Sequence, residues 1–346
     1  MTGPGDELRV TVDGDDLIGC HPPIMATYGR WQLAAIALAR PLICARLTDM
    51  TTNTHPDPVT PAALTGEFLL GGDLPVHRLG FGAMRLPTGT FQGPARDPET
   101  GIAVLRRAVE LGVNHIDTAW FYRRPGVVAN ELIRMALAPY GDDLVIATKV
   151  GPLLDSSGVP SGEAGPAQLR GLVEDNLRSL GVDRLDLVYL RVGGMGGPGG
   201  ESISDRFAAL AELREEGLIR HLGVSNVDAA QLAEARAIAP VAAVQNSFHV
   251  QDRGDAELPA QCEKDGIAFV PFFPLGGGHR PIDATAMAAV TARHGATTAQ
   301  VALAWLLASS PVMLAIPGTG SLGHLEENME AGRIRLTPDD FTALGG

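Results

Sequence analysis

The sequence predicts an α/β protein, a (β/α)8 TIM barrel preceded by an N-terminal β-hairpin. From Phe68 onward, eight short apolar runs alternate with eight longer stretches of helical periodicity, and no change in composition divides them. The apolar runs are continuous rather than interleaved with polar residues, as expected for strands buried on both faces. Regular alternation of strand and helix indicates a parallel sheet within a single domain.

The elements follow one another through a barrel domain assigned to residues 66–346. Residues 68–79 place a Gly-Gly-Asp turn between two apolar arms, which is typical of a hairpin. The barrel strands are expected at Leu79–Met84, Val113–Thr118, Leu144–Val150, Leu185–Arg191, Ile219–Ser225, Val241–Asn246, Ile267–Phe273 and Val312–Ile316. The helices are expected at Pro98–Leu111, Val128–Leu137, Ala167–Leu180, Ser204–Glu216, Asp228–Ala239, Ala256–Lys264, Thr298–Ser309 and Leu322–Ala331.

Residues 1–60 are predicted to be an extension outside the barrel. Its apolar stretch Trp31–Leu47 contains two arginines and a proline, is too short to span a bilayer, and begins too far into the chain to resemble a secretory signal. Because Met50 is a natural start for a compact protein, we expect the extension to be disordered or to come from an over-extended reading frame. The alternative is an amphipathic helix that docks on the barrel.

The net charge and the cysteine content limit the kinds of partner and binding site that are expected. The formal net charge is −13, so neither nucleic acid nor an anionic membrane is an expected partner. The three cysteines have no paired spacing and no histidine cluster beside them, so we expect no disulfide framework and no metal site, and a cytoplasmic location. The expected partner is a small molecule, and the protein is either a monomer or a homo-oligomer.

Two charged residues close neighbouring apolar strands and indicate chemistry. Asp117 ends one predicted strand and Lys149 ends the next. A lysine buried in a strand is costly unless an acid pairs with it, so we expect the two to form one unit. A lysine beside a tyrosine hydroxyl favours the phenolate, so Lys149 is expected to lower the pKa of Tyr122, five residues after Asp117. Such a tyrosine can act as a general acid on a carbonyl oxygen.

Seven motifs together resemble the aldo-keto reductase superfamily over residues 66–332. They are Gly80-Phe-Gly-Ala-Met, Asp117-Thr-Ala-Trp-Phe-Tyr, Thr148-Lys, Gly223-Val-Ser-Asn, Gln245-Asn, Phe272-Phe-Pro-Leu-Gly and Ile316-Pro-Gly-Thr with Glu326-Glu-Asn. The resemblance implies an NAD(P)H-dependent reductase that converts an aldehyde or ketone to an alcohol without metal or flavin. It also implies that Tyr122 is the proton donor and that Asp117 and Lys149 tune it.

The resemblance also implies a cofactor site. Ser225, Asn226 and Gln245 are expected to hold the nicotinamide carboxamide, and Phe272 replaces the usual tyrosine that stacks on the ring. The remaining expected cofactor residues are Leu275, Gly276, Ile316, Gly318, Thr319, His324, Glu327 and Asn328. The loop after Ile316 has no lysine or arginine to meet a 2′-phosphate, but hydroxyl groups, backbone N–H groups and His324 can bind one. We therefore expect NADPH, with NADH as the alternative.

One catalytic position departs from the family pattern. The fourth strand usually ends in a histidine that completes the catalytic tetrad, whereas here it ends in Arg191. Arginine can hold a carbonyl oxygen but does not shuttle a proton. The ending resembles a bacterial sub-branch near the pyridoxal reductases, which favours pyridoxal-like substrates. The missing histidine also leaves a second reading open, an NADPH-binding regulatory or redox-sensing module with weak turnover.

Overall fold

The computed structural model describes residues 59–345, except for residues 91–92, 157, 159, 195–196, 255 and 279–280. The predicted extension, including Trp31–Leu47, therefore lies almost entirely outside the described residues. Seven parallel strands form one sheet in the order β13-β12-β11-β10-β7-β4-β3. They are β3 (Phe81–Gly82), β4 (His115–Asp117), β7 (Val145–Val150), β10 (Leu185–Arg191), β11 (Ile219–Ser225), β12 (Val241–Gln245) and β13 (Ala268–Phe269).

The eighth predicted strand closes the barrel. Residues 312–316 make parallel bridges to both edges of the sheet, Leu79 with Ala315 on one side and Phe269 with Met313 on the other. The Gly80 amide donates to the Ala315 carbonyl at 2.8 Å, which continues the ladder. The predicted barrel is confirmed, with its first, second, seventh and eighth strands shorter than expected.

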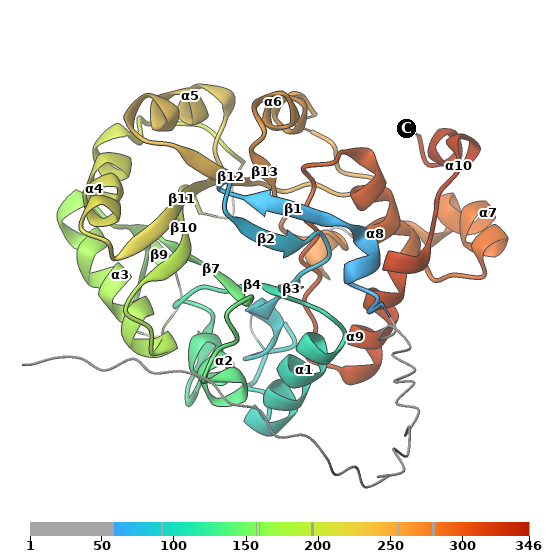
Figure 1. The fold of residues 1–346 in the computed structure, drawn as a ribbon, viewed down its shortest axis with the longest axis horizontal. Helices are drawn as coiled ribbons and strands as arrows, with labels where there is room; N and C mark the ends of the chain where they lie inside the picture. The colour runs from blue at the N-terminus through green and yellow to red at the C-terminus, as the bar shows by residue number, and fades with distance from the viewer. Residues whose placement is uncertain are drawn as a thin grey trace, which may run out of the picture. The chain divides into compact units, whose positions relative to one another are not determined.

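The helices follow in chain order around the sheet (Figure 1). They are α1 (Pro98–Glu110), α2 (Ala129–Leu137), α3 (Pro166–Leu180), α4 (Ser204–Glu215), α5 (Ala229–Ile238), α6 (Glu257–Asp265), α8 (Thr298–Ser309) and α9 (Leu322–Met329). Two further helices, α7 (Ala284–His294) and α10 (Pro338–Ala343), were not predicted. Helix α7 packs on α8, and α10 packs on α7.

The predicted hairpin covers the N-terminal end of the barrel. It consists of β1 (Glu67–Leu70) and β2 (Leu74–His77), paired antiparallel, and lies across the sheet in Figure 1. Leu70, Leu74 and Val76 pack with the inward-facing residues of the barrel strands. Asp73 in the turn accepts from His221 at 2.6 Å, which ties the hairpin to β11. The hairpin therefore closes this end, and the carboxyl ends of the strands remain for chemistry.

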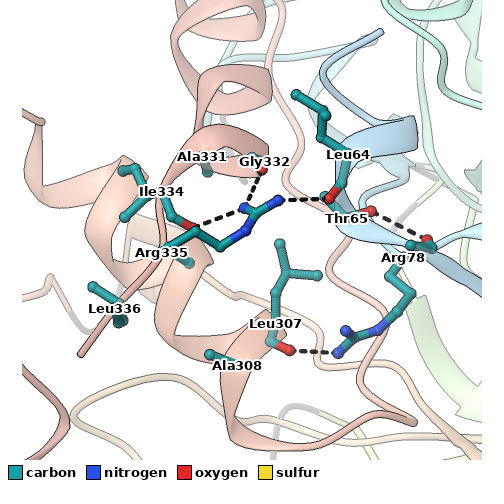
Figure 2. Close-up of a pocket in the computed structure, with 12 residues that line it drawn as sticks. Leu64, Thr65, Arg78, Leu307, Ala308, Ala331, Gly332, Ile334, Arg335 and Leu336 are labelled. Carbon is teal, nitrogen blue, oxygen red and sulfur yellow. Dashed lines mark hydrogen bonds between the residues drawn. The ribbon is translucent and has the colours of Figure 1, made fainter. Parts of the chain in front are cut away.

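A cavity of about 350 Å³ lies beside the hairpin, between η1 (Ala63–Thr65), the end of α8 and residues 331–336 (Figure 2). Arg78 donates to the Leu307 and Ser310 carbonyls at its wall, which caps the C-terminal end of α8. Arg335 likewise donates to main-chain carbonyls, including that of Leu64 at 2.9 Å. We assign this cavity a structural role, because it lies at the end of the barrel opposite the charged strand ends.

Two smaller two-stranded sheets lie beside the carboxyl ends of the barrel strands. Strands β5 (Arg123–Arg124) and β6 (Val127–Val128) form the loop after Tyr122. Strands β8 (Pro152–Leu154) and β9 (Pro160–Glu163) form a hairpin directly after β7. Neither was predicted, because both are short and rich in polar, proline and glycine residues that carry little periodicity.

Candidate active site

Asp117 and Lys149 form an ion pair inside the carboxyl end of the barrel. Lys149 Nζ lies 2.5 Å from Asp117 Oδ1 and also donates to the Thr118 carbonyl at 3.0 Å. Only 3% of the lysine side chain and 4% of the aspartate side chain are exposed. The second carboxylate oxygen accepts from Gln245 Nε2 at 2.8 Å. Strands β4, β7 and β12 thus bring one charged network together, and it holds Lys149 as a cation.

Tyr122 lies half-buried beside this pair. Lys149 Nζ is 5.0 Å from the centroid of its ring. Burial raises the pKa of the tyrosine above its ordinary value, while the charge and hydrogen bond of Lys149 and the charge of Arg191 act in the opposite direction. The expected net fall in pKa is therefore wrong, because loss of hydration and the negative charge of Asp117 together outweigh the two cations. Tyr122 stays protonated at neutral pH, as a proton donor requires.

Arg191 faces the same space from the end of β10. Its Nη2 donates to the Gly194 carbonyl at 3.0 Å, and its Nη1 lies 3.4 Å from Ser225 Oγ. The guanidinium carbon is 4.8 Å from the centroid of the Phe272 ring. The charge of Arg191 also acts on Tyr122. The guanidinium thus lies near Tyr122 and contacts two of the residues that are expected to bind the nicotinamide, Ser225 and Phe272.

The polar residues expected to hold a nicotinamide lie on adjacent strands. Ser225 pairs in register with Arg191 on one side and with Gln245 on the other. Asn226 follows with a φ of 62°, and its Nδ2 donates to the Val192 carbonyl at 3.0 Å. Gln245 is fully buried between the Asp117 carboxylate, to which its Nε2 donates, and the hydroxyl group of Tyr189, with which its side chain also forms a hydrogen bond.

Two loops carry the other residues that are expected to contact the cofactor. After β13, Leu275 is half-buried and the Gly276 amide donates to Phe273 O at 2.8 Å in a tight turn. After the eighth strand, Gly318 lies so close to the Gly82 carbonyl that no side chain fits there. Thr319 Oγ1 accepts from the Ser321 amide at 3.1 Å. The other expected residues are placed as follows: Ile316 and Asn328 buried, Glu327 half-buried, His324 exposed.

A second buried network supports the ion pair from outside the barrel. Thr118 follows Asp117 and Thr148 precedes Lys149, so their side chains point toward the helices. Thr118 Oγ1 donates to Asn130 Oδ1 at 2.8 Å, and Thr148 Oγ1 donates to Asn176 Oδ1 at 2.6 Å. Asn130 Nδ2 donates to Asn176 Oδ1 at 3.0 Å. These bonds join α2 and α3 to the strand ends that carry the charges.

Three other residues near the site have ordinary surroundings. His115 is fully buried two residues before Asp117, and burial lowers its pKa to about 4, so it is a core histidine in its neutral form. Arg123 stacks on Trp120 with its guanidinium carbon 4.4 Å from the ring centroid. Arg124 Nε donates to the Gly93 carbonyl at 3.2 Å.

Three charged residues near the site were missed from the sequence. Glu163 on β9 accepts from the Gly193 amide and its charge acts on Arg191. Arg85 and Arg96 lie against Gly277 and Gly320, in the two loops expected to hold a cofactor. Glu163 ends a strand that was not predicted, and Arg85 and Arg96 lie in the segment between β3 and α1, so position in the sequence carried no signal for them. Their role depends on which loops the closed barrel brings together.

Comparisons with known proteins identify the family and the fold. The sequence model described as "Aldo/keto reductase family" matches residues 78–345. Pyridoxine 4-dehydrogenase of Escherichia coli K12 is 48% identical over 279 residues, covering 80% of this chain and 96% of that protein. An aldo-keto reductase of Klebsiella pneumoniae solved with NADP and acetate is 27% identical, with a TM-score of 0.67 over 80% of this chain and 93% of that one. A thermostable aldo-keto reductase solved with the inhibitor epalrestat is 30% identical, with a TM-score of 0.68 over 80% and 98%.

Proposed function

Because this chain belongs to the aldo/keto reductase family and is an oxidoreductase, we propose that it uses NADPH to reduce an aldehyde or ketone to an alcohol. The observation that carries the proposal is the buried Lys149–Asp117 pair with the Tyr122 ring beside it. A pure binding protein gains nothing from a buried ion pair aimed at a tyrosine. The relatives solved with NADP and NADPH support this choice of cofactor.

The polar residues fit a nicotinamide carboxamide. Ser225 at the end of β11, Asn226 directly after it and Gln245 at the end of β12 would hold the carboxamide, and Phe272 offers a ring face for stacking. When bound, NADPH supplies the hydride that adds to the carbonyl carbon. The protein then has to hold the carbonyl oxygen and give it a proton.

Tyr122 gives that proton from its hydroxyl group. Burial keeps the group protonated at neutral pH, and the positive charges of Lys149 and Arg191 stabilise the phenolate left after transfer. Asp117 and Gln245 fix Lys149 in place. Solvent restores the proton, so the cycle adds one hydride and one proton to the carbonyl group.

Arg191 holds the carbonyl oxygen where a histidine stands in most of the family. Its guanidinium has donors beyond those directed at Gly194 and Ser225, and it cannot be deprotonated at working pH. We therefore assign proton transfer to Tyr122 alone and orientation of the oxygen to Arg191.

The substrate class we propose is a pyridine carbaldehyde of the pyridoxal type, reduced to the corresponding alcohol. It is supported by the 48% identity to pyridoxine 4-dehydrogenase. The test follows loss of NADPH absorbance with pyridoxal, an unsubstituted aromatic aldehyde and an aliphatic aldehyde, and follows pyridoxine oxidation with NADP+. Preference for pyridoxal by at least about tenfold in kcat/KM is expected; equal rates with all three would overturn the substrate class.

The alternative is an NADPH-binding regulatory module, and the arginine at position 191 is the observation in its favour. The two functions differ in turnover. Binding of NADPH without reduction of any aldehyde in the panel would favour the regulatory module and reject the enzyme. Turnover that Tyr122→Phe abolishes would favour the enzyme.

A further inference from the structure

The loop after the eighth strand has no cation of its own for a phosphate. Residues 316–324 contain hydroxyl groups and one exposed histidine but neither lysine nor arginine. The structure brings an arginine to this loop from far away in the sequence. Arg96 Nη1, from the segment before α1, donates to the Gly320 carbonyl at 2.9 Å across a separation of 224 residues.

The backbone on both sides of Arg96 is held in place. Its amide donates to the Pro87 carbonyl at 2.9 Å, and Thr88 forms an antiparallel bridge with Ala95. Asp97 directly follows and caps α1 by accepting from the Thr100 amide at 3.0 Å. The side chain therefore leaves a fixed point, and its reach to Gly320 is set by the fold.

Two glycines make room for the guanidinium. A methyl group at Gly320 would overlap it, and a methyl group at Gly89 would lie 3.0 Å from Nη2. Gly320 is buried, so its missing side chain leaves space that the arginine fills. The guanidinium thus occupies a slot lined by backbone, with its Nη1 directed at the Gly320 carbonyl.

The charge in this slot is not neutralised by the part of the chain that is described. Arg96 has no carboxylate partner there, and its Nε is buried without a hydrogen-bond partner. Arg85 lies close enough for the two positive charges to repel, and its Nη2 donates to the Gly277 carbonyl at 2.5 Å. A cation that has no carboxylate partner among the described residues and lies beside this loop favours an anion.

We propose that Arg96 binds the 2′-phosphate of NADPH, supplying from the loop before α1 the cation that the loop after the eighth strand lacks. The proposal rests on the proposed function, because it assumes a dinucleotide in this barrel. The guanidinium would form charge-assisted hydrogen bonds with the phosphate oxygens through donors that it does not direct at Gly320. Arg85 adds to the positive field from the side of Gly277.

The test measures the Kd of NADPH and of NADH by titration calorimetry, without substrate. Arg96→Gln should raise the Kd of NADPH at least about tenfold, the scale of a lost charge-assisted bond, and leave that of NADH within about twofold. Gly320→Ala should act in the same direction by displacing the guanidinium. Arg106→Gln is the matched control, because Arg106 lies on the exposed face of α1, the helix that follows Arg96. It should change neither Kd.

Two outcomes would overturn the assignment. Equal weakening of NADPH and NADH by Arg96→Gln would place the arginine on the pyrophosphate, and an unchanged Kd for NADPH would remove it from the site. If the wild-type protein binds neither dinucleotide, the proposed function itself fails. If it binds NADPH and reduces aldehydes while Arg96→Gln has no effect, only this inference fails.

Discussion

Lys149 Nζ lies 2.5 Å from Asp117 Oδ1 in the interior of the barrel, with both side chains at least 96% buried. Such a pair stabilises a fold little compared with apolar packing, because both ions lose their hydration. Its value here is to keep a positive charge beside Tyr122. The Gln245 amide on the other carboxylate oxygen prevents Asp117 from turning away.

Breaking this pair should cost considerable stability. Asp117→Asn leaves a buried ammonium group without its counter-ion, so the free energy of unfolding in urea should fall by about 3–5 kcal/mol. Asp175→Asn, which breaks the exposed pair with Arg178, should change it by less than about 1 kcal/mol. The double variant Asp117→Asn/Lys149→Met should recover part of the loss. A single variant as stable as the wild type would show that Lys149 is neutral.

Removing the Tyr122 hydroxyl should remove turnover and spare binding. Tyr122→Phe should lower kcat for aldehyde reduction by at least about 10²-fold, the scale of positioned acid catalysis, with little change in the Kd of NADPH. Tyr140→Phe is the control, because the Tyr140 hydroxyl donates to the Leu180 carbonyl away from the site. Near-full activity of Tyr122→Phe would rule the residue out as the acid.

The pH dependence should reflect a tyrosine whose pKa is raised. Reduction needs the protonated hydroxyl, so the rate should stay level through neutral pH and fall only above about pH 10. Arg191 does not titrate in this range and adds no second limb. A fall near pH 7 in the wild-type profile would contradict the assignment of Tyr122 as the only titrating group.

Arg191 should act on both the tyrosine and the substrate. Arg191→Met removes a charge that lowers the pKa of Tyr122, so that pKa should rise further and alcohol oxidation, which needs the phenolate, should slow at fixed pH. The KM for the aldehyde should also rise. Arg178→Met on the surface of α3 is the matched control. If the oxidation rate and KM are both unchanged, the guanidinium plays no part.

His115 should make the fold sensitive to acid. Burial lowers its pKa from 6.5 to about 4, so between these pH values the unfolded chain binds a proton that the folded barrel does not bind. The contribution of neutral His115 to the free energy of unfolding is fully present above pH 6.5. It is lost as the pH falls toward 4, by up to about 3 kcal/mol. His115→Leu should therefore lose less stability between pH 6.5 and 4 than the wild type in urea titrations. Parallel pH profiles for the two proteins would show that His115 does not titrate there.

Much of the fold was readable from the sequence because it depends on local order. Hydrophobic periodicity is set by neighbouring residues, so the eight strand segments and the helices that follow them were located to within a few residues. Helix α7 was missed, because a regular alternation with one helix after each strand leaves no place for a second helix between the seventh and eighth strands. The positions of Asp117 and Lys149 followed from the same logic, because a parallel barrel gathers the ends of its strands at one rim.

The sequence alone determined the barrel, the strand-end charges and the presence of an arginine at position 191. Only the tertiary structure decided the net pKa of Tyr122, since burial competes with two cations and its size depends on the closed barrel. Only the tertiary structure brought Arg96 to Gly320. Contacts between residues more than two hundred positions apart depend on how loops meet once the sheet has closed, and local patterns carry no information about that meeting.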